Sequence, residues 1–177
     1  MQNLSIVGFP RIGEQRELKR VVEDFFNHSI ARGELLEKAA GLRRKHWLIQ
    51  AEKGIDFIPS NDFSFYDTFL DTAYMLNVIQ DMYKDLQLDP IETYFAMAKG
   101  YQQGSNDVKA LAMRKWFNTN YHYMVPVIDR ETDFRLNGSK PFEEYSEALA
   151  LGIRTKPVIT GPLTFLKLSK INAGNKT

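Results

Sequence analysis

Four short apolar runs recur along the chain, and each leads into a stretch with the spacing of a helix. The runs are rich in β-branched residues and close at glycine, proline or polar turn residues, which is typical of buried strands. They cover residues 4–8, 55–59, 121–128 and 156–160. Because strands that alternate with helices pair in parallel through right-handed crossovers, this order predicts an α/β fold.

The helices between the runs are marked by apolar stripes and by boundary residues. The first stripe has the spacing of one helix face and consists of Leu18, Val21, Val22, Phe25 and Phe26. Asp89 followed by Pro90 predicts a capped start for a helix that ends at Gly100. Further helices are expected over residues 29–53, 64–78, 142–152 and 163–168, and polar segments over 102–108, 129–139 and 172–177.

Two parallel architectures fit this order of elements: an open doubly wound sheet and a (β/α)8 barrel. A complete barrel takes about 250 residues and eight strands. The chain has 177 residues and four predicted strands. It therefore corresponds to an open sheet or to half of a barrel.

The composition narrows the class of partner. Lysine and arginine number 23 against 22 acidic residues, and this net charge of +1 gives no general attraction to nucleic acid or membranes. There is no cysteine, so disulfides and thiolate metal ligands are excluded for this chain. No apolar run approaches the roughly 18 residues of a membrane span, and the N-terminus lacks a signal-peptide pattern. We expect a cytoplasmic protein.

The turn between the first run and the first helix is the most informative segment. Gly8 and Gly13 flank it at the carboxyl end of a predicted strand, where α/β proteins bind ligands. Arg16 and Lys19 follow three residues apart, so both point from one face near the helix start, whose dipole also favours anions. The pattern predicts a receptor for carboxylates or phosphates, and the alternative is an ordinary solvated helix start. It does not match a nucleotide-binding fingerprint.

Two further junctions carry polar or aromatic side chains. Asn61, Asp62 and Ser64 follow the second run, where turn and helix-cap chemistry explains them. In the segment KWFNTNYHY, residues 115–123, ring faces with neighbouring amides would suit a flat heterocycle. The alternative, which the chemistry alone favours, is that these aromatics belong to the core and that His122 is a buried imidazole.

Metal binding has no support in the sequence. The histidines, His28, His46 and His122, are far apart and lack the spacing of metal ligands. His46 lies in the basic run RRKH, which is most simply a solvated helix face. The sequence therefore predicts no zinc site in this chain.

A resemblance to a known family extends this interpretation. Nearly the whole chain is spanned, in order, by GFPRIGEQRELK, IPSNDFSFYD, YFAMAKGYQ, KWFNTNYHY and KPVITGPLTFLKLSK. With these segments the chain resembles the first part of cobalamin-independent methionine synthase. The resemblance implies a methyltransferase of methionine biosynthesis with two face-to-face (β/α)8 barrels. Such an enzyme transfers a methyl group from 5-methyltetrahydropteroyltriglutamate, a folate with a triglutamate tail, to homocysteine.

The resemblance also implies which residues bind the substrate. The family's RELK motif falls on Arg16, Glu17, Leu18 and Lys19, and the lysine of its KWF segment falls on Lys115. In the family these positions hold the folate tail. Zinc activates the homocysteine thiol without cobalamin, and its ligands, a His, two Cys and a Glu, belong to the second barrel. We therefore expect no catalytic residue and no zinc ligand in this chain.

The same resemblance gives residues 1–177 as approximately the first half of the N-terminal TIM barrel, without the catalytic zinc barrel. The chain alone is then expected to be inactive, and homocysteine to bind only with the second barrel. A shortened chain, a damaged reading frame and a short paralogue remain open. So do two other roles: a non-catalytic module that holds polyglutamyl folate or another polyanion, and a half barrel that self-associates through open sheet edges.

Overall fold

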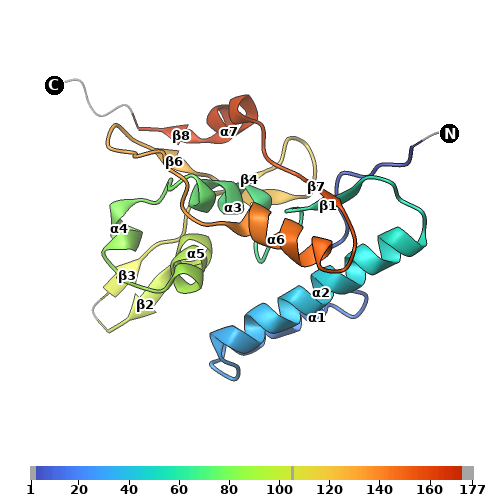
Figure 1. Cartoon of the computed structure of the whole chain (residues 1–177). Coiled ribbons are helices and arrows are strands. Elements are labelled where there is room, and N and C mark those ends of the chain that lie inside the picture. Colours follow the sequence, from blue (N-terminus) through green and yellow to red (C-terminus); the bar gives the residue numbers. More distant parts are fainter. Residues whose placement is uncertain (1–2, 105, 173–177) are drawn as a thin grey trace. The chain divides into compact units, whose positions relative to one another are not determined.

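The computed structural model describes residues 3–104 and 106–172, which form two compact units (Figure 1). The first unit comprises the described part of Met1–Phe65 together with Lys140–Ile159, and the second comprises that of Tyr66–Ser139 and Thr160–Thr177. Beyond Asn172, the expected polar tail lies outside the described residues. None of the described helices combines the length and the apolar character needed to cross a bilayer.

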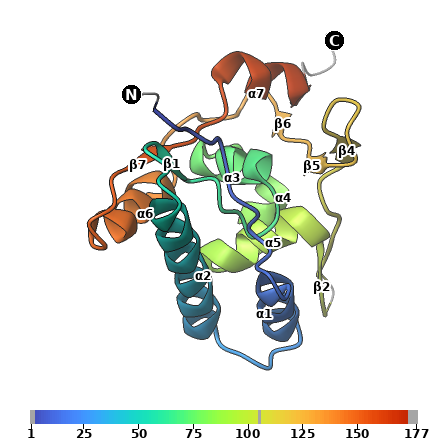
Figure 2. The same cartoon turned by 90° about the vertical axis from the view of Figure 1, so that its right-hand side faces the viewer.

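The first unit combines helices with one parallel pair of strands. Its helices are α1 (Glu17–Phe26), α2 (Arg32–Glu52) and α6 (Lys140–Leu149), and its strands are β1 (Ile58–Ser60) and β7 (Thr155–Pro157). In the parallel pair, Ile58 lies beside Thr155 and Ser60 beside Pro157. Helix α1 lies alongside α2 (Figure 2).

The core of the first unit forms where α2 and α6 pack on β1. Trp47, Ile58 and Ala148 are its buried centre, and the Trp47 indole N–H donates to the Pro59 carbonyl at 3.0 Å. Helix α1 buries Leu18 and Val21 of the predicted stripe. The helical periodicity of the sequence therefore identifies both the elements and their buried faces.

The first apolar run, residues 4–8, does not form the buried strand that the sequence predicts. It makes one isolated parallel bridge, between Ser5 and Phe57, and the side chains of Leu4 and Val7 are 52% and 81% exposed. β-Branched residues favour an extended backbone, but burial requires neighbours on both sides of the segment. The bridge near Phe57 is the one strand-like pairing recorded for this segment among the described residues.

The second unit holds the remaining elements. Its helices are α3 (Thr68–Met75), α4 (Asp81–Lys84), α5 (Pro90–Lys99) and α7 (Pro162–Leu168). Its strands are β2 (Tyr101–Gln103), β3 (Asn106–Val108), β4 (Met113–Lys115), β5 (His122–Met124), β6 (Val127–Ile128) and β8 (Lys170–Ile171). β2 pairs with β3 and β4 with β5 in antiparallel fashion, whereas β6 and β8 are parallel. The core gathers around Phe69 and includes Ala73, Val78, Tyr123, Val125, Ile128 and Phe165.

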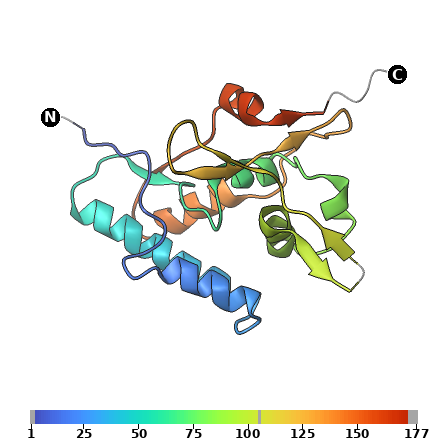
Figure 3. The same ribbon diagram turned by 180° about the vertical axis from the view of Figure 1, so that it is seen from behind.

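The antiparallel pairs were not predicted. Residues 102–108, expected as a polar loop, contain most of the β2–β3 hairpin, visible as yellow-green arrows in Figure 3. Backbone hydrogen bonds hold this hairpin, and the side chains of Gln102 and Gln103 in β2 are exposed, so no apolar alternation marks this strand in the sequence. The run 121–128 is divided into β5 and β6 because Pro126, which lies between them, has no N–H for a strand ladder.

The start of α3 also differs from the prediction. The helix was expected to begin at Ser64, but Asp67 is its N-cap: the Asp67 carboxylate accepts from the Phe69 N–H at 2.7 Å and the Leu70 N–H at 3.0 Å. Ser64 is fully buried upstream of the helix. Taken together, the chain is a mixed α/β protein with a parallel strand pair in each unit.

Candidate functional site

The turn before α1 is folded back onto the start of the helix. The Gly13 carbonyl accepts from the Arg16 N–H at 3.2 Å, and the Ile12 carbonyl accepts from the Leu18 N–H at 3.1 Å. Arg16, the N-cap residue, has φ 61° and ψ 36°, the left-handed conformation. That conformation is uncommon for a residue with a side chain and is found most often at ligand sites and tight turns.

Glu17 stabilises this turn by a hydrogen bond between its carboxylate and the backbone of the turn. Its carboxylate accepts from the Gln15 N–H at 2.9 Å, and hydrogen bonds from the backbone N–H groups of Glu17 itself and Gln15 lower the pKa of the carboxyl. Gly13 has φ +82°, and a Cβ there would overlap the Glu17 carboxylate. The positive φ therefore favours glycine at this position, and a Cβ there would displace the Glu17 carboxylate.

The two predicted cations lie together at the start of α1. Arg16 and Lys19 are both exposed. The Lys19 Nζ lies 3.5 Å from a Glu23 carboxylate oxygen, and both side chains are 54% exposed. Such an exposed ion pair contributes little, so an arriving carboxylate can compete for Lys19. Leu18, by contrast, is 2% exposed and anchors the helix to the core.

The turn is also held against α2. The Glu14 carboxylate pairs with the Lys45 ammonium at 3.0 Å, and the Phe9 ring lies 4.8 Å from the His46 ring between centroids. These contacts border an open cavity of about 190 Å³ lined by Phe9, Pro10, Gly13, Glu14, Lys45, His46 and Ile49.

His46 departs from its predicted environment. It is 6% exposed, so the interpretation of RRKH as a solvated face is wrong at this residue. Burial lowers the pKa of His46, while the negative charge of Asp62 acts in the opposite direction. The imidazole is turned toward the aromatic ring of the folded-back turn, and this contact accounts for its burial.

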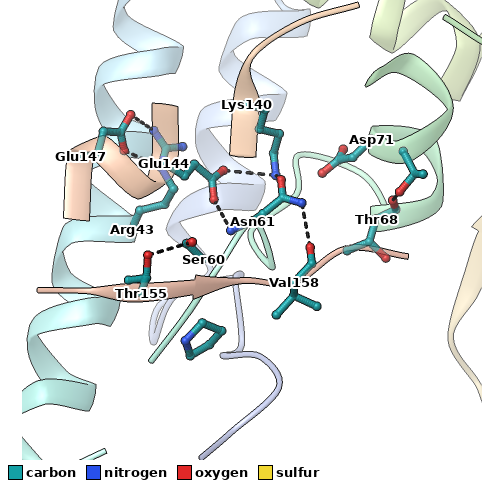
Figure 4. A network of polar contacts seen from close by, with 12 residues as sticks. Arg43, Ser60, Asn61, Thr68, Asp71, Lys140, Glu144, Glu147, Thr155 and Val158 are labelled. Atoms are coloured by element: carbon teal, nitrogen blue, oxygen red, sulfur yellow. Dashed lines mark hydrogen bonds and ion pairs between the residues drawn. The ribbon is translucent and has the colours of Figure 1, made fainter. Parts of the chain in front are cut away.

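A polar network lies at the carboxyl ends of β1 and β7 (Figure 4). Glu144 of α6 is 3% exposed; its carboxylate accepts from the Asn61 N–H at 2.7 Å and pairs with Lys140 at 3.2 Å. The Asn61 amide donates to the Val158 carbonyl at 2.7 Å and accepts from Lys140 at 2.9 Å. Burial raises the pKa of Glu144, and the positive charge of Lys140 opposes that rise.

Asp62, the next residue, joins this network to the turn before α1. Its carboxylate accepts from the Phe9 N–H at 2.8 Å. The interpretation of Asn61 and Asp62 as turn residues is therefore correct for Asn61, which has φ 60°, and incomplete for Asp62. Sequence reasoning also missed Glu144, although a signal existed: it occupies the helical stripe of α6 with Pro141 and Ala148, where an apolar residue would be usual.

Lys115 belongs to the second unit. It is the last residue of β4, opposite His122 of β5, and is exposed. Arg16, Glu17, Leu18 and Lys19 belong to the first unit and Lys115 to the second. These four consecutive residues lie at one helix start, where Leu18 is buried, and their role in binding, alone or with Lys115, stays a prediction.

Two aromatic residues of the segment 115–123 pack against the core. Trp116 and Tyr123 pack edge-on against Phe69, with ring centroids 5.1 Å and 5.0 Å apart. Phe117 is 65% exposed. The core interpretation is confirmed for Trp116 and Tyr123, whereas His122 is exposed and not the buried imidazole of that alternative.

The zinc that the resemblance implies does not fit the residues present. Within residues 3–104 and 106–172 no three His, Cys, Asp or Glu side chains are grouped as metal ligands. The sequence contains no cysteine. We therefore derive no chemical step through a metal.

Comparison with known proteins decides the family. The family model described as the N-terminal domain of cobalamin-independent synthase matches residues 3–177. The chain belongs to this family. In this cobalamin-independent synthase N-terminal domain, four of the five predicted binding residues lie at the start of α1, and the family model covers this helix.

Full-length relatives of this N-terminal domain carry the name 5-methyltetrahydropteroyltriglutamate–homocysteine methyltransferase. The protein from Bifidobacterium adolescentis is 56% identical over 167 residues, covering 94% of this chain and 22% of the relative. That from Streptococcus thermophilus is 54% identical over 172 residues, covering 97% and 23%. That from Streptococcus suis is 53% identical over 170 residues, covering 96% and 23%. The chain thus spans less than a quarter of the length of these relatives.

Proposed function

We propose that this chain is the folate-tail-binding region of a methyltransferase that makes methionine from homocysteine. The methyl donor is 5-methyltetrahydropteroyltriglutamate, and the region corresponds to about the first half of a (β/α)8 barrel. The observation that carries the proposal is the pair of exposed cations, Arg16 and Lys19, at one helix start in a member of this family. The names of the relatives supply the substrate class and the reaction.

The chemistry of the site suits a chain of carboxylates. A triglutamate tail presents several negative charges in series, and fixed cations bind them with charge-assisted hydrogen bonds. The start of α1 adds its dipole. Glu17 carries the opposite charge, but its carboxylate is occupied by the Gln15 N–H, so it orders the turn more than it repels the ligand. The Lys115 ammonium provides a further positive charge that binds the carboxylates of the tail.

The chain positions the substrate and takes no part in activating the thiol. Homocysteine binding, zinc and methyl transfer are assigned to other parts of a full-length enzyme, which works without cobalamin in the cytoplasm. The chain alone is expected to bind the folate without producing methionine. A turnover assay with added zinc and homocysteine tests this expectation, and clear methionine production would contradict it.

Calorimetry with mono- and triglutamyl methyltetrahydrofolate tests the binding role. We expect tighter binding of the triglutamyl form, and loss of that preference in the Arg16→Ala, Lys19→Ala double variant. Lys53→Ala is the matched control, because Lys53 is an exposed cation of the same unit outside the α1 start. Equal affinity for the two forms in the unaltered chain would overturn the proposal. Light scattering on the same samples tests self-association, which stays a prediction.

A further inference from the structure

Asp62 connects the end of β1 to the backbone of the turn before α1. Its carboxylate accepts from the Phe9 N–H at 2.8 Å across 53 residues of sequence. The same side chain lies 3.6 Å from the position that a Cβ on Gly8 would occupy. Asp62 therefore contacts two consecutive residues just before Pro10, whose ring fixes the backbone φ angle.

The direction of Asp62 is itself fixed by its neighbour. Asn61 is held in the left-handed conformation by hydrogen bonds with Glu144, Val158 and Lys140, at 2.7, 2.7 and 2.9 Å. Glu144 is 3% exposed, so the hydrogen bond that it accepts from the Asn61 N–H is stronger than a surface contact. The network thus aims the carboxylate of the following residue at the turn.

The other end of the turn leads directly to Arg16. Glu14 is paired with Lys45 at 3.0 Å, and the Arg16 N–H donates to the Gly13 carbonyl at 3.2 Å. The Glu14–Lys45 pair is exposed and adds little to this turn, whereas the ring of Pro10 restricts the backbone next to Phe9. A shift at Phe9 is transmitted to the left-handed Arg16 because the intervening turn is closed by its own hydrogen bonds.

We infer that Asp62 is a positioning residue that fixes, through the Phe9 N–H, the turn that presents Arg16 to the carboxylates of an oligoglutamate ligand. The inference rests on the proposed tail-binding function. The inference predicts a change in ligand affinity opposite in direction to the change that electrostatics alone predicts. Asp62 carries a negative charge near a predicted anion site, so electrostatic repulsion alone predicts that its removal strengthens binding of the oligoglutamate. If Asp62 positions the turn, removal of its hydrogen-bond acceptor weakens that binding.

Three variants of the chain separate these effects. Asp62→Ala removes both charge and acceptor, whereas Asp62→Asn removes the charge and keeps an acceptor oxygen. Asp56→Ala is the matched control, because the Asp56 carboxylate accepts from the Leu4 N–H at the same distance of 2.8 Å on the same segment, farther from Arg16. The readouts are the dissociation constants of mono- and triglutamyl methyltetrahydrofolate and hydrogen exchange at the Phe9 amide.

We expect Asp62→Ala to weaken triglutamyl binding about tenfold, the effect of one lost hydrogen bond of ordinary strength, and to change monoglutamyl binding less. Exchange at the Phe9 amide should accelerate in this variant. Asp62→Asn should bind the triglutamyl form at least as tightly as the unaltered chain, and Asp56→Ala should match it. A role confined to folding would lower stability without this dependence on tail length.

Two outcomes overturn the inference while leaving the tail-binding function intact. One is an Asp62→Ala chain that binds the triglutamyl form as tightly as before, or more tightly, while the Arg16→Ala, Lys19→Ala variant loses it. The other, decisive if Asp62→Ala fails to fold, is weaker binding by Asp62→Asn. Equal binding of the two folates by the unaltered chain overturns the proposed function, and the inference with it.

Discussion

The Asp67 carboxylate links the start of α3 to Met124 of β5, whose backbone N–H donates to it at 3.0 Å. The other carboxylate oxygen caps α3 by accepting from Phe69 and Leu70. Asp67 is 1% exposed, so one buried side chain satisfies three backbone donors from two elements of the same unit. This arrangement makes Asp67 the polar centre of the second unit.

Asp67→Ala should destabilise the chain by about 2 kcal/mol or more. The substitution removes a helix cap and leaves the buried Met124 N–H without its acceptor. Asp89→Ala is the matched control, because Asp89 caps α5 with its side chain accepting from Ile91 and Glu92, and a cap alone is worth about 1 kcal/mol. Urea unfolding monitored by circular dichroism compares them. An equal loss in both variants would show that the bond to Met124 contributes nothing.

The stability of the chain should depend on pH through Asp67. Burial raises the pKa of this carboxyl from its ordinary 3.8 to about 6, so the folded state binds its proton more tightly than the unfolded state. Its contribution to the free energy of unfolding is therefore fully present below about pH 4 and is lost as pH rises through 6. Relative to Asp67→Asn, which does not titrate, the unaltered chain should lose up to about 3 kcal/mol over that interval. A constant difference across the interval would contradict the prediction.

Glu144→Ala should cost about 3 kcal/mol of folding stability. The substitution opens a cavity, removes the acceptor of the Asn61 N–H and leaves Lys140, whose side chain is 33% exposed, without its buried partner. Glu34→Ala provides the comparison, because Glu34 pairs with Lys38 at 2.8 Å while both side chains are nearly half exposed. That exposed pair is worth only about 0.5 kcal/mol. Thermal unfolding of the two variants should therefore give clearly separated midpoints.

Two glycine substitutions should have opposite signs. Gly13→Ala should destabilise the chain by about 1–2 kcal/mol, because φ is +82° there and the new Cβ meets the Glu17 carboxylate. Gly41→Ala lies within α2, where a Cβ has no neighbour within 4 Å, and should stabilise by up to about 1 kcal/mol. Denaturant midpoints measure both. A gain in stability from Gly13→Ala would disprove the described turn.

The sequence predicts the elements whose signals are local. α1 agrees with its apolar stripe, because 3.6-residue periodicity records which face is buried. α2 lies within the predicted range 29–53, and α5 agrees with its Asp89 cap and the terminal Gly100. The prediction of a buried strand at residues 4–8 is wrong because a propensity for extended backbone does not supply a neighbouring strand. The β2–β3 hairpin is missed because its polar, exposed residues carry no alternation.

The residues of the candidate site likewise fall into those with a local sequence signal and those that depend on long-range contacts. Arg16 and Lys19 could be found from the sequence because their grouping depends only on positions within one helix start. The contacts of Asp62 and Glu144 could not be found in this way, because their partners, Phe9 and Asn61, lie 53 and 83 residues away. Such contacts exist only once the chain is folded, and nothing in the local pattern specifies them.

The left-handed backbone of Arg16 has a consequence for how this region can be altered. For a residue with a side chain this conformation carries a steric penalty, which glycine escapes. Replacing Arg16 by glycine would remove this steric penalty and also delete the guanidinium. Folding stability would then rise while the proposed affinity for the ligand would fall. If Arg16 binds the ligand as proposed, selection for stability and selection for binding therefore act against each other at this position.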